Sequence, residues 1–188
     1  MSIKNIKITK SSKFLILLLS SLIVGAANAA VFYSMTMQPA VSITTADVIF
    51  VAGNDYPTGS SLGQNSTWVY LALNAYPNTT LTYEQPLNIS NTDTASHTFR
   101  LRHITITPSN GSAEVGNFSF INFVVQNTAG TAQNSFNYTT TGNDWITPPT
   151  TSYMTLPAST TWILYVETGA AAGANDVTAN IQIAVDVQ

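Results

Sequence analysis

Side chains that could carry out chemistry are few in this chain of 188 residues. His97 and His103 are its two imidazoles, and no second pair of metal ligands lies near them in the sequence, so a metal site is not expected. Cysteine is absent, which excludes disulfides, thiolate nucleophiles and sulfur-ligated metals. No serine stands in a nucleophile-elbow motif, and no glycine-rich phosphate loop precedes a helix. We therefore expect neither a catalytic site nor a cofactor, and a protein that is not an enzyme.

Asparagine supplies the one chemical motif that recurs. Six positions match Asn-x-Ser/Thr without proline at x, the acceptor pattern for N-linked glycans. In a chain rich in Asn, Ser and Thr this pattern also arises by chance. If the host glycosylates its exported proteins, we expect glycans at most of them. The six positions are Asn65, Asn78, Asn88, Asn110, Asn117 and Asn137.

Residues 1–29 have the layout of an export signal. A basic stretch is followed by an apolar run of about eleven residues and then by a cluster of small residues. The apolar run is too short to span a membrane, which takes about 20 residues. We predict that the segment is removed by cleavage between Ala29 and Ala30. The alternative is a type IV pilin signal that retains the apolar run, although Lys13 is followed directly by Phe14 rather than by Gly or Ala.

Charge is distributed unevenly along the chain. Four of the six Lys and Arg residues lie in the first thirteen positions, and all nine acids lie after them. A chain beginning at Ala30 would keep Arg100 and Arg102 as its cations and would have a formal charge of −7. Nucleic acids and anionic membrane surfaces are not expected as partners, because both attract clustered cations.

The remainder of the chain has the patterns of β-strands. Apolar and polar residues alternate most clearly over 177–187, which predicts a strand with one buried face. Clusters of Gly, Pro, Asn and Asp separate the candidate strands and predict turns. About seven short strands without a sustained helical pattern predict an all-β fold, an Ig-like antiparallel β-sandwich over residues 44–188. The other candidate strands cover 41–51, 67–73, 79–90, 97–107, 114–126 and 160–167.

The candidate strand 97–107 changes phase along its length. Phe99 and Leu101 share one parity, whereas Ile104 and Ile106 share the other, and a β-bulge near Arg102 and His103 would reconcile them. Arg100 and Arg102 then point the same way. We expect a solvated strand face, with an acid as a possible partner, and the alternative is a contact with a glycan or a neighbouring molecule.

Aromatic side chains allow a second function to be considered. A row of exposed rings could form a platform for sugars, which would make the chain a carbohydrate-binding or envelope domain, although such rings more often pack in a sandwich core. The candidates are Trp68, Tyr70, Tyr76, Tyr83, Trp145, Tyr153, Trp162 and Tyr165.

Residues 30–43, which follow the predicted cleavage site, contain an apolar strand. One face of it carries Val31, Tyr33, Met35 and Met37, and a free tail with such a face would aggregate. The segment is either the first strand of its own domain or a strand donated to the open sheet edge of another copy. Strand donation is head-to-tail, so it would build a homopolymer rather than a closed dimer.

Three stretches resemble those of known filament subunits: 29–34 at the start of the processed chain, 48–53, and 86–93. In layout the chain resembles subunits of archaeal donor-strand filaments, the thread and bundling-pilus proteins, and more remotely the TasA and camelysin fibre proteins. The acid found soon after the first aromatic residues in camelysins has no counterpart here. The resemblance implies an Ig-like subunit whose N-terminal strand completes the next subunit, with N-glycosylation in the thread-like members.

Together these patterns predict an extracellular, glycosylated cell-surface filament. Residues 1–29 would be the signal, 30–43 the donor strand and hinge, and 44–188 the pilin domain. The partners would be further copies of the chain and N-linked glycans, and the filament would serve adhesion or biofilm formation. The alternative function is that of a secreted carbohydrate-binding or envelope β-sandwich.

Overall fold

The computed structural model describes residues 10–11, 13, 15, 17–19, 46–175 and 177–188. Contacts divide the chain into two units, Met1–Ile43 and Thr44–Gln188. The described residues of the first unit are all helical. Within the described residues, no helix combines the length and the apolar character that a membrane crossing requires.

Two sets of predicted positions lie outside the described residues. These are the cleavage site at Ala29 and Ala30 and the apolar face of the donor strand, formed by Val31, Tyr33, Met35 and Met37.

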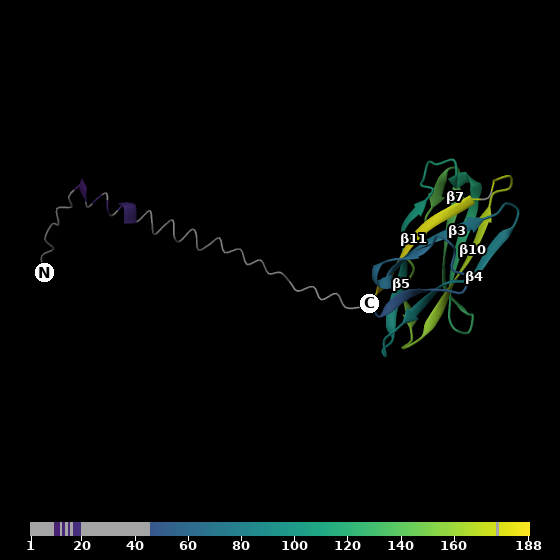
Figure 1. Cartoon of the computed structure of the whole chain (residues 1–188), viewed down its shortest axis with the longest axis horizontal. Coiled ribbons are helices and arrows are strands. Elements are labelled where there is room, and N and C mark those ends of the chain that lie inside the picture. The colour runs from purple at the N-terminus through teal and green to yellow at the C-terminus, as the bar shows by residue number, and fades with distance from the viewer. Residues whose placement is uncertain (1–9, 12, 14, 16, 20–45, 176) are drawn as a thin grey trace. The chain divides into compact units, whose positions relative to one another are not determined.

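The second unit is built from two antiparallel sheets, which confirms the predicted all-β sandwich (Figure 1). Two short 3-10 turns, Gln64–Ser66 and Val115–Asn117, interrupt the strands. The six-stranded sheet has the order β1 (Val48–Ala52), β4 (Thr80–Asn91), β10 (Thr161–Ala170), β6 (Phe118–Gln126), β7 (Ala132–Thr141) and β8 (Asp144–Ile146). The five-stranded sheet has the order β2 (Ser61–Leu62), β3 (Trp68–Ala75), β11 (Val177–Val187), β5 (His97–Thr107) and β9 (Met154–Leu156).

Apolar and polar residues alternate along β11, and the apolar face lies in the core, as predicted. Ala179, Ile181 and Ile183 are fully buried, and the polar residues between them face solvent on the other side of the sheet. β11 lies at the centre of its sheet, between β3 and β5. A strand in this position is paired on both edges and covered on one face, which suits its β-branched residues.

The predicted β-bulge lies in β5. Gln182 of β11 is opposite Thr105 and Ile183 is opposite His103, so Ile104 is the extra residue. The bulge returns Ile106 to the core, where it is buried, while Ile104 itself remains exposed. The change of parity in the sequence is therefore explained by one inserted residue.

β7 was not predicted, because most of its residues are polar. Phe136 and Tyr138 are its two large apolar side chains, and both are buried. A tight loop at Gly142, whose φ is 61°, connects β7 to β8. Gly53, after β1, is also required: a Cβ there would lie 1.8 Å from the Gln85 carbonyl oxygen.

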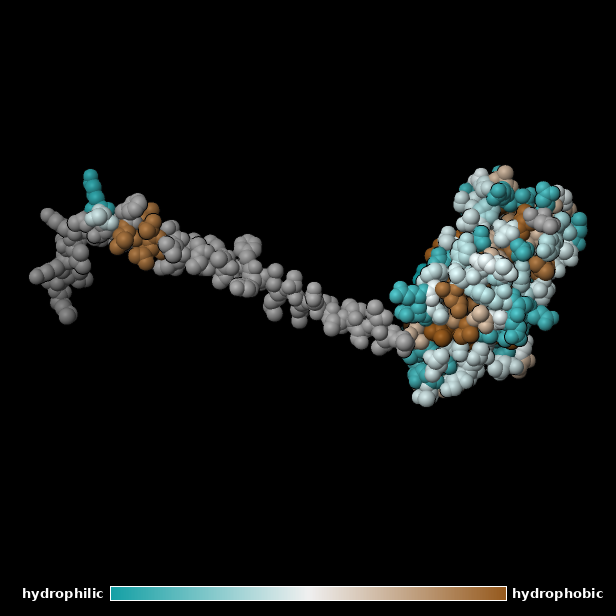
Figure 2. Space-filling view, in the orientation of Figure 1, coloured by the Kyte–Doolittle hydropathy of each residue, from teal (hydrophilic) through white to brown (hydrophobic). Residues whose placement is uncertain are grey.

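The core is rich in aromatic rings and is closed to solvent. Phe123 and Phe136 stack with centroids 4.7 Å apart, and Tyr138 meets both rings edge-on. On the visible face of the sandwich, apolar residues form only small patches among polar ones (Figure 2). The exposed large apolar residues of the described sandwich are Val51, Tyr76, Ile104, Ile146, Tyr153 and Val187.

Candidate functional site

Sheet edges are the places where a strand from another molecule could bind. β7 is ten residues long, but β8 pairs with it only at Thr139–Thr141. The tight loop makes Thr141 and Asp144 a hydrogen-bonded pair, so alternate β7 residues direct their backbone groups toward that side. Ser135 and Asn137 therefore direct theirs outward beyond the end of β8.

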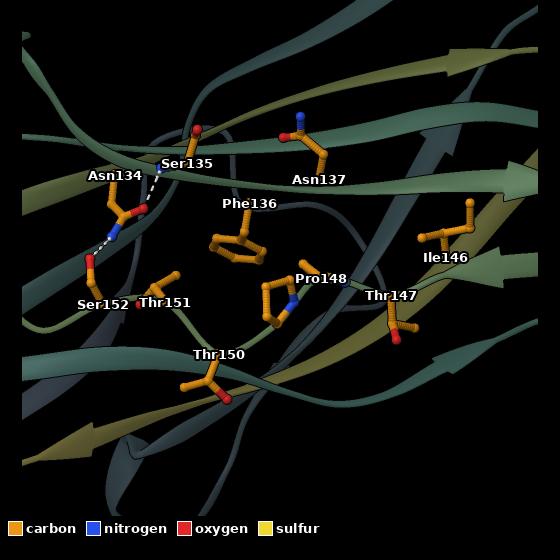
Figure 3. A pocket seen from close by; sticks show the side chains of 11 residues that line it. Asn134, Ser135, Phe136, Asn137, Ile146, Thr147, Pro148, Thr150, Thr151 and Ser152 are labelled. Atoms are coloured by element: carbon orange, nitrogen blue, oxygen red, sulfur yellow. Dashed lines mark hydrogen bonds between the residues drawn. The ribbon is translucent and has the colours of Figure 1, made fainter.

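A pocket lies beside this part of β7 (Figure 3). Its volume is about 400 Å³, and its other wall is the irregular segment 146–152, which runs from β8 toward β9. Phe136 and Pro148 lie close together at its centre, whereas Asn137 points away. Asn134 Nδ2 donates a hydrogen bond to Ser152 Oγ and bridges the two walls. The Ser135 amide donates to Asn134 Oδ1, so this group of the edge is already bonded. The β7 edge thus combines the outward-facing backbone groups of Asn137 with an apolar floor.

Two other edges are closed by the sandwich itself. On β5, the Thr151 amide donates to the Leu101 carbonyl, and the Thr151 hydroxyl accepts from the Leu101 amide. On β3, the Asn74 amide donates to the Tyr83 hydroxyl, and the Asn74 carbonyl accepts from Thr168 Oγ1. These contacts occupy backbone groups that an added strand would need.

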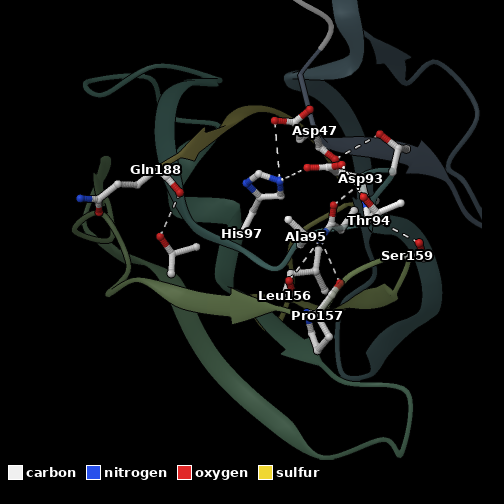
Figure 4. A network of polar contacts seen from close by, with 12 residues as sticks. Asp47, Asp93, Thr94, Ala95, His97, Leu156, Pro157, Ser159 and Gln188 are labelled. Carbon is white, nitrogen blue, oxygen red and sulfur yellow. Dashed lines mark hydrogen bonds and ion pairs between the residues drawn. The ribbon is translucent and has the colours of Figure 1, made fainter.

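A cluster of polar side chains lies at the end of the sandwich where β1 begins (Figure 4). His97 Nε2 lies 2.8 Å from Asp93 Oδ2 and 3.7 Å from Asp47 Oδ2. The hydrogen bond from His97 and a second from the Thr94 amide hold the pKa of Asp93 below its ordinary value. Sequence reasoning missed this cluster because Asp47 and Asp93 come from distant segments and form no motif.

Asn91 holds the turn beside this cluster. It is buried, and its Nδ2 donates to the carbonyls of Ala95 and Pro157 and, at 3.3 Å, to that of Leu156. Its Oδ1 accepts from the Asp93 amide. One side chain therefore connects the end of β4 to the segment after β9.

His103 lies in different surroundings from His97. Its Nδ1 is 2.9 Å from the Tyr138 hydroxyl, and burial lowers the pKa of His103. Because each histidine has its own partners, the two do not form a common site in the described part of the chain.

The two arginines share one acid, in line with the expectation of a solvated face. Arg102 and Arg100 contact Asp186 at 3.1 and 3.4 Å, and hydrogen bonding from Arg102 lowers the pKa of Asp186. Arg100 also lies over the Tyr153 ring, 5.0 Å from its centroid. These contacts fix the arginines on the outer face of the five-stranded sheet.

The six glycan acceptor positions differ in accessibility. Asn65, Asn78, Asn110 and Asn137 are exposed, whereas Asn88 and Asn117 are half-buried. Asn110 Oδ1 accepts from the Trp145 amide, which fixes that side chain within a turn. Four positions are therefore open enough for modification of their amide nitrogens.

The eight candidate rings differ in exposure, and Tyr76 and Tyr153 are exposed. Trp145 and Trp162 are buried in the core. Trp68 is packed against Gly63, at which a Cβ would overlap the indole ring. The rings of Trp145 and Trp162 are therefore not available at the surface.

No family model and no curated protein matches the chain. Among solved structures, it is similar to the enzymatically active domain of tailspike protein 4 of Bacteriophage CBA120, with 9% sequence identity and a TM-score of 0.27. The match covers 77% of this chain but 20% of that one, so the chain spans about a fifth of that structure's length. A similarity this weak carries no argument about activity.

Proposed function

We propose that the chain is the structural subunit of an extracellular, glycosylated filament built head-to-tail by strand donation. The supporting observation is the composition of the core. Within the described residues, the buried apolar residues run from Val48 to Val185, and both sheets are made of strands that follow residue 47. We assign the apolar face predicted for residues 31–37 to the sheet edge of another copy, where it would be covered.

We propose the β7 edge as the acceptor. The backbone groups of Asn137 would form ladder bonds, the Ser135 amide would exchange its bond to Asn134 for one to the donated strand, and the pocket over Phe136 would receive anchor side chains. Each anchor contributes on the order of 1.5–3 kcal/mol if fully buried. The ten residues that follow Met37, up to Asp47, can span up to about 35 Å when extended.

Deletion of residues 30–38 tests the proposal. We expect the truncated protein to remain monomeric or to aggregate, and to form no filaments in negative-stain electron microscopy. A matched pair of variants keeps the length of the segment and changes one face of the strand at a time. Serine on the apolar face, at Val31, Tyr33, Met35 and Met37, should abolish filaments. Glutamine on the other face, at Ser34 and Thr36, should not. Filaments formed by the deletion variant would contradict strand donation.

Cysteine cross-linking tests the acceptor edge, because the natural chain contains no cysteine. Ser34→Cys combined with a cysteine at Gln133, Ser135 or Asn137 should give a ladder of disulfide-linked oligomers in assembled filaments. The control pairs Ser34→Cys with Ser61→Cys on β2 and should give no ladder. A ladder from the β2 control alone would move the acceptor site to the opposite side of the sandwich.

Adhesion or biofilm formation is the role that we propose for the filament. Glycans at the four exposed acceptor positions would coat a protein with few charged groups and keep it soluble. Mass spectrometry of the native protein would identify the occupied positions.

A further inference from the structure

The polar end of the sandwich places one imidazole nitrogen opposite two carboxylates. His97 Nε2 faces Oδ2 of both Asp93 and Asp47 (Figure 4). Carboxylates are ionised at neutral pH, so an unprotonated Nε2 in this position would direct its lone pair at both of them. Either an N–H on Nε2 or a metal ion between the three groups removes this repulsion.

A proton satisfies one of the two contacts. An N–H on Nε2 donates to Asp93 at 2.8 Å, but the 3.7 Å separation from Asp47 is too long for a hydrogen bond. A metal ion could bind all three groups. Bonds of about 2.1 Å in a tetrahedral site place ligand atoms about 3.4 Å apart, a value between the two separations. The three donor atoms all lie within 4.8 Å of one another.

Two of the three groups are already positioned by other contacts. The Thr94 amide donates to Asp93 Oδ1, which leaves Oδ2 to face His97. The Asp93 backbone is held in turn by Asn91 Oδ1 and by the Ser159 amide. The side chain of His97 is 19% exposed and extends from the start of a paired strand. Asp47 is 52% exposed and has room to close on an ion.

We propose that Asp47, Asp93 and His97 form a binding site for a divalent transition-metal ion such as Zn²⁺, with water completing the coordination. One imidazole and two carboxylates suit Zn²⁺, whereas Ca²⁺ takes six to eight oxygen ligands and Mg²⁺ retains most of its water. Asp47 directly precedes β1. A bound ion would connect the start of β1 to the turn between β4 and β5. The inference does not depend on the filament proposal.

Isothermal titration of the full-length chain with Zn²⁺ tests the site. We expect saturable binding of one ion per chain, with a shift of the His97 imidazole resonances in NMR spectra. His97→Gln and Asp47→Asn should each weaken binding at least tenfold. Ca²⁺ and Mg²⁺ should not compete at similar concentrations.

Glu114→Gln is the matched control, since it removes the same charge from an exposed residue outside the cluster and should leave affinity unchanged. Asp47→Asn should still fold, because Thr92 donates its hydrogen bonds to the backbone carbonyl of Asp47 and not to its side chain. Circular dichroism would verify the fold of each variant. The proposal is overturned if the natural chain shows no saturable binding, or if both cluster variants bind Zn²⁺ as the natural chain does.

Discussion

β5 contains both histidines of the chain, and their surroundings differ. His97, at the start of the strand, faces two carboxylates at the end of the sandwich and retains some contact with solvent. His103, six residues further along the strand, packs edge-on against the ring of Tyr138 and forms a hydrogen bond with its hydroxyl. The same residue type is thus a candidate ligand in one place and a packing residue in the other. The neighbours that each position meets decide the role.

The regions around the two histidines differ in the same way. We call Phe123, Phe136, Tyr138 and His103 the aromatic interior. We call Asp47, Asn91, Asp93 and His97 the polar end. The aromatic interior depends on buried area and ring packing, whereas the polar end depends on hydrogen bonds and charge. Substitutions should therefore change stability through different mechanisms in the two regions, and by different amounts.

Phe123→Ala should have the largest effect. Phe123 is fully buried and packs on both Phe136 and Tyr138. Removing its ring leaves a cavity between the sheets, and we expect a loss of about 3–5 kcal/mol in the free energy of unfolding. Urea unfolding followed by tryptophan fluorescence measures this loss. The neighbouring Val124→Ala, on the half-buried outer face, should cost much less, and equal losses would contradict the difference between interior and surface.

Asn91→Ala should have the next largest effect and is the strongest test of the polar end. The substitution leaves the carbonyls of Ala95, Leu156 and Pro157 without their shared donor. Buried groups that lose a partner cost about 1–3 kcal/mol, and we expect a loss of about 2–3 kcal/mol in the same unfolding assay. Ser90→Ala, which removes an exposed hydroxyl contact on the same strand, should cost under about 0.5 kcal/mol. A negligible loss for Asn91→Ala would mean that solvent replaces these bonds.

Much of the fold could be predicted from local patterns in the sequence. Alternation identified β11, and the change of parity identified the bulge in β5, because each pattern depends on residues that are close in sequence. β7 was missed because Asn, Ser, Thr and Gln dominate it, and its place beside β6 is decided by Phe136 and Tyr138. Strand order also depends on contacts between distant segments, which no local pattern reports.

The candidate sites were harder to predict than the fold. The polar end joins Asp47 to Asp93 and His97 only after β1 pairs with β4 and β5 begins in the opposite sheet. Part of the β7 edge is left without a partner strand because β8 is only three residues long. The turn at Gly142 indicates that a hairpin forms there but does not indicate where β8 ends. The available signal in the sequence was the presence of acids next to predicted strands that could pair near His97.

His103→Gln tests whether the aromatic interior responds to pH, and we expect a smaller effect than either truncation. Burial lowers the pKa of His103 in the folded state, so the unfolded chain takes up a proton first as the pH falls below about 6.5. The natural chain should therefore lose stability on acidification from pH 7.5 to pH 5. The variant should lose less, since it lacks this group, while His97 remains in both. Equal pH slopes in urea unfolding would count against a partly buried His103 that stays neutral in the folded state.

Asp186→Asn should have the smallest effect. It measures how much a partly exposed ion pair contributes to the free energy of unfolding, for comparison with the buried contacts of Phe123 and Asn91. Asp186 accepts from Arg102 and Arg100, and this bonding lowers its pKa in the folded state. The stabilisation is present above the ordinary pKa of Asp, about 3.9, and is lost as the pH falls through the lower folded value. At pH 7 we expect the substitution to cost under about 1 kcal/mol, because partly exposed pairs are screened by solvent. Unfolding at pH 7 and pH 2.5, at low and high salt, should show the difference between the two proteins shrinking with acid and with salt. A difference that persists at pH 2.5 would show that Asp186 acts through packing rather than through its charge.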